Sequence, residues 1–136
     1  MRLFPGVRPS NLGVRGGALA APPRSPNAVS SQADAVKDAG HHIAPFGANG
    51  DADGTWRRLV ALVRALPSVE IVTTTDRYVH AECSTTLLGF VDDLELLLDR
   101  AAAVIHVRSA SRLGRRDFGV NRARVETLRA QLDSGC

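Results

Sequence analysis

The sequence has few of the features that mark specialised protein classes. It contains only two cysteines, Cys83 and Cys136, far apart in a chain of 136 residues, so we expect no disulfide framework. No run approaches the roughly 20 apolar residues that cross a membrane. The first residues also lack the continuous apolar core of a secretory signal. We therefore expect a cytoplasmic protein with no membrane span.

Motifs for metal and nucleotide binding are absent as well. His41, His42 and Cys83 are residue types that ligate metals, but no two candidate ligands have the spacing of a zinc site. The chain has no Walker loop, nucleophile elbow or dinucleotide fingerprint. We therefore expect no bound metal and no cofactor.

Lysine and aromatic residues are scarce. Lys37 is the only lysine, so the net charge of +3 rests almost entirely on arginine, as codon bias alone would produce. Aromatic residues make up 4% of the chain and offer few platforms on which bases could stack. Nucleic-acid binding is therefore a minor alternative, and it would use the C-terminal arginines Arg112, Arg115, Arg116, Arg122, Arg124 and Arg129.

The remaining composition is that of one globular domain. Hydrophobic residues make up 44% and charged residues 23%, and 136 residues are too few for two separate cores. Most of the glycines and prolines precede residue 55, which indicates loop or tail there. We expect a flexible tail over residues 1–20 and a single α+β domain over residues 21–134.

Helical periodicity appears twice. The first helix should begin near Trp56, with Asp53 or Thr55 as its cap, and end before Pro67. The last helix should begin at Asn121, a plausible cap, because apolar residues then recur at helical spacing at Val125, Leu128 and Leu132.

Four strands are expected between the helices, at residues 70–75, 78–84, 90–98 and 104–109, forming two hairpins. In the second hairpin, a register with Asp99 opposite Val104 sets Glu95 against Arg108 and buries Leu94, Leu96, Leu98, Ile105 and Val107 together. In the first hairpin, alternation directs Val72, Val79, Ala81 and Cys83 to the same face. The expected fold is a two-layer α+β sandwich: a four-stranded antiparallel sheet with both helices on one face, after a long irregular N-terminal segment.

The most distinctive feature is the polar stretch over residues 108–122, which we call the arginine-serine run. Its arginines offer rigid donor forks, its serines offer hydroxyls, and it leads into a helix N-terminus, which can bind an anion. The alternative is that Asp117 and Glu95 pair with the arginines and pin the run to the sheet. The candidate ligand-binding residues are Arg108, Ser109, Ser111, Arg112, Asp117, Asn121 and Arg122.

A second candidate lies on the other face of the predicted sheet. Alternation places His80, Glu82, Asp93 and Glu95 there, with His106 and Tyr78 near them; we call this the polar sheet face. Acid–base chemistry would need these groups to be covered, and the N-terminal segment could be that cover. Otherwise they are ordinary solvated residues of an antiparallel sheet.

Three segments carry a family resemblance. Residues 25–33 read Ser-Pro-Asn-Ala-Val-Ser-Ser-Gln-Ala, residues 90–95 read Phe-Val-Asp-Asp-Leu-Glu, and residues 108–124 contain the arginine-serine run. In this order they resemble the bacterial and plastid domain of unknown function 1499, over roughly residues 12–132. The family has no established activity, so the resemblance implies domain identity and no reaction.

The first of these segments, together with the residues just before it, departs from the family pattern. Relatives carry two cysteines where this chain has Pro22 and Ala28. The paired absence implies that those cysteines bond to each other in relatives from oxidising compartments, and it argues against a redox or metal role here. Asn27, Ser30 and Ser31 remain and suit a structural turn.

These observations favour a non-catalytic binding or accessory module. Its arginine-serine run would contact a small anionic ligand or a protein partner. The alternatives are a small hydrolase-like enzyme, with His80 or an acidic residue of the polar sheet face as general base, and a weak nucleic-acid binder.

Overall fold

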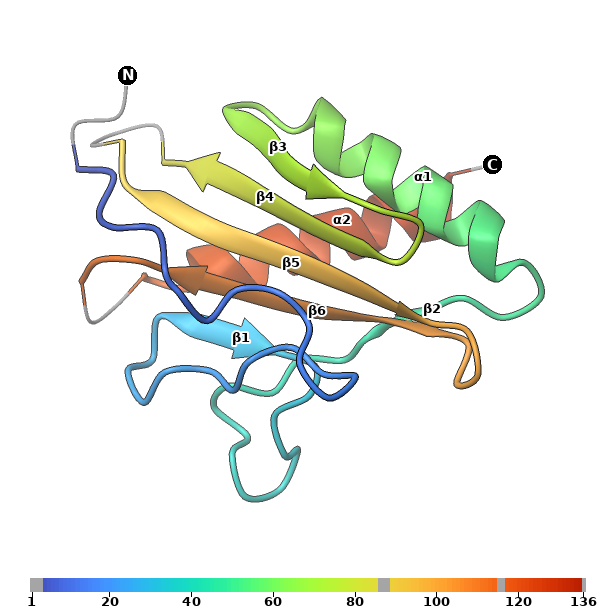
Figure 1. The fold of residues 1–136 in the computed structure, drawn as a ribbon, viewed down its shortest axis with the longest axis horizontal. Helices are drawn as coiled ribbons and strands as arrows, with labels where there is room; N and C mark the ends of the chain where they lie inside the picture. The colour runs from blue at the N-terminus through green and yellow to red at the C-terminus, as the bar shows by residue number, and fades with distance from the viewer. Residues whose placement is uncertain (1–3, 86–88, 115–116, 136) are drawn as a thin grey trace.

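The computed structural model describes residues 4–85, 89–114 and 117–135, and these form one sheet covered by two helices (Figure 1). No helix among the described residues is both long and apolar enough to cross a bilayer. The elements, in chain order, are β1 (Ala28–Ser30), β2 (Phe46–Gly47), α1 (Ala52–Ala65), β3 (Val69–Thr74), β4 (Tyr78–Ser84), β5 (Val91–Asp99), β6 (Val104–Ser111) and α2 (Val120–Ser134).

The sheet has six strands, in the order β1-β6-β5-β4-β3, and β2 also pairs with β6. The α+β class is confirmed, but the prediction of four strands is wrong. The additional strands, β1 and β2, are three and two residues long, which is too short to show an alternating pattern. Both come from the stretch rich in glycine and proline, and both pair antiparallel with β6.

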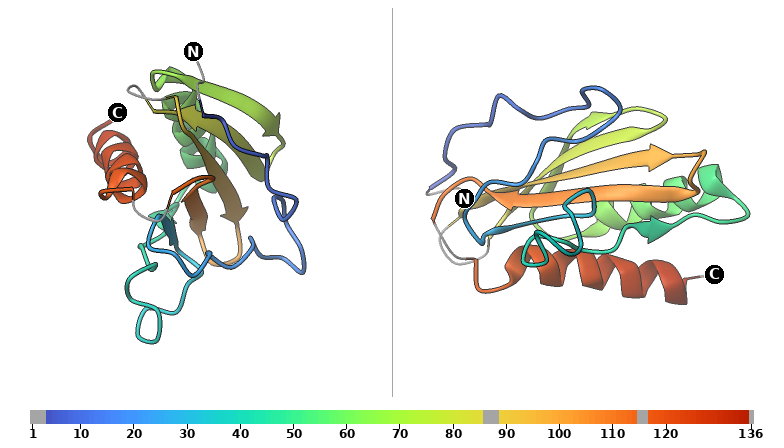
Figure 2. Two further views of the ribbon diagram at one scale, coloured as in Figure 1. Left: turned by 90° about the vertical axis from the view of Figure 1, so that its left-hand side faces the viewer. Right: turned by 90° about the horizontal axis from the view of Figure 1, so that it is seen from below.

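Both helices lie on the same face of the sheet, and the N-terminal segment crosses the opposite face (Figure 2). The core lies between sheet and helices. It combines Trp56, Leu59 and Val63 of α1 with Val125 and Leu128 of α2 and with the inward residues of the strands. Each helix therefore buries the apolar stripe that its spacing predicts.

The register of the hairpin formed by β5 and β6 is as predicted. Asp99 pairs with Val104, and Glu95 pairs with Arg108. The apolar residues assigned to its inner face are all buried. Val72 of β3 is not where alternation placed it, because a bulge between Ile71 and Thr73 shifts the register against β4 and leaves Val72 37% exposed.

Both helices begin differently from the prediction. Helix α1 starts at Ala52, and the Asp51 carboxylate accepts a hydrogen bond from the Gly54 N–H at 2.9 Å, so neither Asp53 nor Thr55 is the cap. Helix α2 starts after Gly119, whose φ of 79° lies in the left-handed region that glycine tolerates.

Asn121 is inside helix α2 and does not cap it. Instead, the Asp117 carboxylate accepts hydrogen bonds from the N–H groups of Gly119 and Asn121, at 2.9 and 3.1 Å. Burial alone would raise the pKa of Asp117, but these bonds and one from the Asn121 side chain hold it below its ordinary value.

Replacing Asp51 with alanine removes the cap of α1. We expect the Asp51→Ala variant to lose about 1 kcal/mol of unfolding free energy, measured by urea denaturation, because a helix N–H loses its acceptor. Asp133→Ala, at an exposed position near the end of α2, is the control and should change stability by less than about 0.5 kcal/mol. Equal losses in the two variants would contradict the capping role.

Candidate functional site

The polar sheet face is buried. His80 and Glu82 of β4 and Asp93 and Glu95 of β5 point away from the helices, and each is at most 3% exposed. They are therefore not the solvated outer residues of an ordinary antiparallel sheet. Charged groups removed from water need partners, and those partners include Arg108 of β6, Arg112 directly after it and the N-terminal segment.

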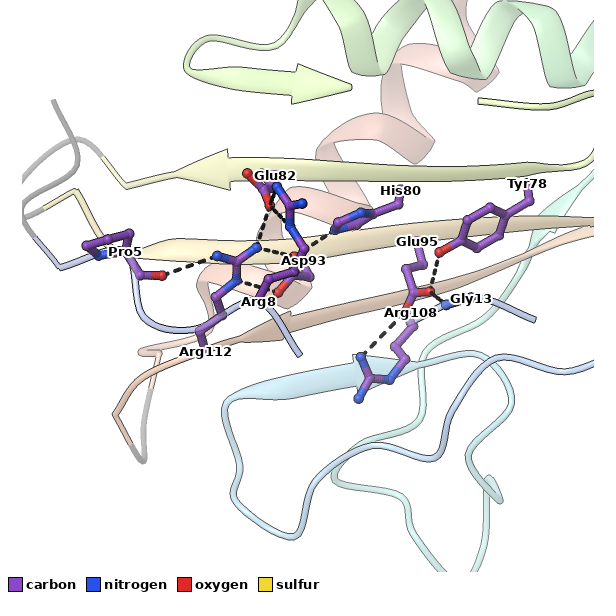
Figure 3. A network of polar contacts seen from close by, with 10 residues as sticks. All are labelled: Pro5, Arg8, Gly13, Tyr78, His80, Glu82, Asp93, Glu95, Arg108 and Arg112. Carbon is purple, nitrogen blue, oxygen red and sulfur yellow. Dashed lines mark hydrogen bonds and ion pairs between the residues drawn. The ribbon is translucent and has the colours of Figure 1, made fainter. Parts of the chain in front are cut away.

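The N-terminal segment, residues 4–21, supplies part of the cover (Figure 3). The Arg8 Nε donates to Glu82 Oε2 at 2.7 Å, and the Gly13 N–H donates to Glu95 Oε2 at 2.8 Å. The carbonyl oxygens of Pro5 and Ala21 accept longer hydrogen bonds from arginines of the arginine-serine run. In three of these four contacts the N-terminal segment uses main-chain atoms, so its residue types do not reveal these contacts.

Arg112 is the centre of the first cluster on this face. Its guanidinium group forms a fork with Asp93, with Nε–Oδ2 and Nη2–Oδ1 distances of 2.8 Å, and Nη2 also donates to Glu82 Oε2 at 2.6 Å. His80 Nε2 lies 2.7 Å from Asp93 Oδ1. Burial tends to raise the pKa of Asp93, but hydrogen bonds from Arg112 and His80 outweigh it and hold the pKa below its ordinary value. The bond to Asp93 raises the pKa of Arg112, which stays charged.

His80, Glu82 and Asp93 could also ligate a metal. One ligand atom from each lies within 4.8 Å of the others. The search for sequence spacing missed this grouping because the residues come from neighbouring strands and not from one motif. In this structure the guanidinium groups of Arg112 and Arg8 supply the positive charge that these carboxylates need.

A second cluster on the face contains Tyr78, Glu95 and Arg108. The Tyr78 hydroxyl donates to Glu95 Oε2 at 2.5 Å, and burial, with this bond, raises the pKa of Tyr78. Arg108 Nη1 is 3.5 Å from Glu95 Oε1, an ion pair that is not a close hydrogen bond. Among the described residues, Glu95 Oε1 and Arg108 Nε are buried without a hydrogen-bond partner. Such a group costs about 1–3 kcal/mol, so this cluster is less well satisfied than the first.

The arginine-serine run is divided between the two faces of the sheet. Arg108 and Arg112 point to the polar sheet face, whereas Ser109 and Ser111 bond to Asn121 of α2 on the helix side. Arg122 donates to the carbonyl oxygens of Gly40 and His42 in a loop. The predicted ligand-binding residues therefore do not converge on one cradle, because neighbours along a strand face opposite ways.

Sequence reasoning missed the ion pair between Asp92 and Arg124. Arg124 Nη2 is 2.8 Å from Asp92 Oδ2, and its Nη1 donates to Ser109 and Asn121. A signal was present, because alternation places the charged Asp92 on the same face as Leu94, where it needs a buried partner.

Three residues of the types found in hydrolase triads lie in a row: Ser31, His106 and Asp99. Ser31 Oγ is 3.2 Å from His106 Nδ1, and His106 Nε2 is 3.8 Å from Asp99 Oδ2. The second distance exceeds hydrogen-bond range, and the Ser31 hydroxyl accepts the Val107 N–H at 2.9 Å. Ser31 also donates its own N–H to the Val107 carbonyl, so the row fixes residues 25–33 to β6.

Removing Arg112 should strongly destabilise the fold. In the Arg112→Ala variant, the buried carboxylates of Asp93 and Glu82 lose a shared donor, and we expect a loss of about 3–5 kcal/mol in urea denaturation. Arg57→Ala, at an exposed position on α1, is the matched control and should cost less than about 0.5 kcal/mol. A small effect of Arg112→Ala would show that the fork does not hold the sheet face together.

The lowered pKa of Asp93 predicts a dependence of stability on pH. A carboxyl whose pKa is lower in the folded state contributes stability above its unfolded pKa and loses it as pH falls through the folded value. Between those two values, the wild type should lose stability more steeply than Asp93→Asn, by up to about 1.4 kcal/mol per pH unit. Urea denaturation from pH 5 downward measures the slopes, and equal slopes would contradict the prediction.

The comparisons with known proteins agree with the resemblance of the three segments. A search of curated proteins finds no match. A family model does match residues 18–132, most of the chain, and it bears the description "Protein of unknown function (DUF1499)". The match includes β1, the polar sheet face and the arginine-serine run. The chain therefore belongs to the DUF1499 family, as the three segments predict.

Proposed function

We propose that this domain is a non-catalytic binding module whose ligand contacts the polar sheet face through a cationic group, such as a guanidinium or an amine. The observation that carries the proposal is the incomplete pairing of buried charges. Among the described residues, Glu95 Oε1 is a buried acceptor without a hydrogen-bond partner, and a cationic donor can satisfy it; Arg108 Nε, the other such atom, is a donor that a cation does not satisfy. A purely structural network would normally satisfy such atoms.

The charge balance of the face favours a cation over an anion. Among the described residues, its carboxylates are Glu82, Asp93 and Glu95, and its buried guanidinium groups are those of Arg108 and Arg112. These three carboxylates thus meet two buried guanidinium groups. Arg8 adds a further cation, and its side chain is 56% exposed while its Glu82 partner is buried. Because the Arg8 side chain is exposed, a ligand cation can replace it at the buried Glu82 carboxylate with the smallest loss of buried contacts.

The anion-binding alternative has less support. The donors of Arg112, Arg122 and Arg124 bond to carboxylates, carbonyl oxygens and side chains of the chain itself. These contacts favour the pinning role of the arginine-serine run. They also weaken the nucleic-acid alternative, because the Arg112 side chain is buried and those of Arg122, Arg124 and Arg129 bond to groups of the chain itself. The other two arginines of that alternative, Arg115 and Arg116, lie outside the described residues.

The hydrolase alternative is also weaker. His80 is 3% exposed, and its Nε2 is taken up by Asp93, so it would need rearrangement before it could accept a proton from a substrate.

The Arg8→Ala variant tests the proposal with a small probe. Loss of Arg8 vacates one position at Glu82, and we expect millimolar methylguanidinium to shift the amide resonances of Glu82 and Asp93 saturably in NMR spectra of this variant. Wild type should need a higher concentration, because Arg8 competes for the same carboxylate. Adding Glu82→Gln to the variant should abolish the shifts.

Inorganic phosphate is the comparison probe. Saturable phosphate shifts in residues 108–122, with none from methylguanidinium, would replace the cation proposal with the anion-binding one. If neither probe binds saturably, the polar sheet face is not a ligand surface.

A further inference from the structure

We infer that the natural ligand of the polar sheet face is an extended peptide segment that carries an arginine, and that residues 4–17 of this chain occupy its place intramolecularly. This inference rests on the proposed function and names the ligand class. The N-terminal segment contacts the face with one side chain and two main-chain groups (Figure 3).

The contacts are those that a bound peptide would make. Arg8 places a cation on Glu82, the Gly13 N–H donates to Glu95, and the Pro5 carbonyl accepts from Arg112. Two of the three use groups that every peptide has, and one requires an arginine. The face therefore recognises a chain direction and one basic residue, which is how peptide-binding surfaces combine affinity with specificity.

Gly13 sets the second point of contact. Its φ of +100° lies in a region that residues with a side chain rarely adopt, and this conformation presents the N–H to the buried Glu95 carboxylate. A peptide ligand that copies this approach needs an arginine followed by a glycine at the spacing of Arg8 and Gly13.

The segment is attached to the domain weakly enough to exchange. Of residues 4–21, only Leu19 is buried. The one ladder contact within residues 4–21 is an isolated bridge between Arg15 and Ala18, and Val7 is 87% exposed. Phe4 is 49% exposed and makes one ring contact, with Phe90, at 5.5 Å between centroids. Apart from that contact, little apolar surface would be lost if residues 4–17 left the face, and such regions open at low free energy.

Leu19 is the first residue of the N-terminal segment that is held firmly in the domain. It is 6% exposed, and its N–H donates to Gln32 Oε1 at 2.9 Å. Residues before it can leave while β1 and the rest of the sheet keep their pairing. A tethered segment competes at an effective concentration in the millimolar range, so a partner peptide must bind more tightly or the tethered copy must be weakened.

The experiment adds the peptide to the full-length chain. A fluorescently labelled peptide of residues 4–17 is titrated, by anisotropy, into wild type and into the Arg8→Ala/Gly13→Pro variant, whose own segment has lost both anchors. We expect the variant to bind at least about tenfold more tightly than wild type, because tethered competition is reduced. Glu82→Gln in the variant, or Arg8→Ala in the peptide, should weaken binding by a similar factor.

Three results would overturn the inference. If the peptide binds neither protein while methylguanidinium still shifts Glu82 and Asp93, the cation site stands and the peptide ligand is wrong; if both probes fail, the proposed function fails as well. Binding that is indifferent to Glu82→Gln and to the peptide's arginine also contradicts it.

Hydrogen exchange on the wild type gives an independent measurement should the double variant fail to fold. The Gly13 amide should exchange through a local opening, at least about tenfold faster than the β4 and β5 ladder amides of Val79 and Leu96. Exchange of Gly13 only at the rate of those ladder amides would show that the segment is a fixed part of the fold.

Discussion

The fork between Arg112 and Asp93 is the contact on which the buried polar face depends. Once carboxylates from two neighbouring strands are removed from water, their charges need donors within hydrogen-bond distance. Arg112 reaches both Asp93 and Glu82 because it follows directly after β6, which pairs with β5. On the other side of the sheet the same condition applies to the buried Asp92, which Arg124 of α2 satisfies, whereas the rest of that face is stabilised by apolar packing.

The position of β6 explains why the arginine-serine run cannot act as one loop. The strand pairs with β5 along one edge and with β1 and β2 along the other, so its residues alternate strictly between the two faces. Arginines then point to the carboxylates, and serines point to Asn121 of α2. The arginine-serine run is continuous in the sequence, but its arginines and its serines make separate contacts on opposite sides of the sheet.

Much of the fold follows from the sequence because alternation and helical spacing report burial. They predict the register of Glu95 with Arg108, the inner face of β5 and β6, and both helices. They cannot predict β1 and β2, which are too short for periodicity, or the bulge that exposes Val72. The cover over the polar face is equally invisible, because Pro5, Gly13 and Ala21 contact it through main-chain atoms.

Buried charge also limits what the face can accept. An anion would add a negative charge beside Glu82, Asp93 and Glu95, where Arg112 already bonds to Glu82 and Asp93 and Arg108 forms an ion pair with Glu95. A metal ion would have to compete with the guanidinium of Arg112 at Glu82 and Asp93, and so would have to break the fork between Arg112 and Asp93. A guanidinium that replaced Arg8 at Glu82 would add no negative charge and would leave the fork between Arg112 and Asp93 intact. For the proposed ligand, Glu82 is therefore the carboxylate whose described partner Arg8 is the most exposed.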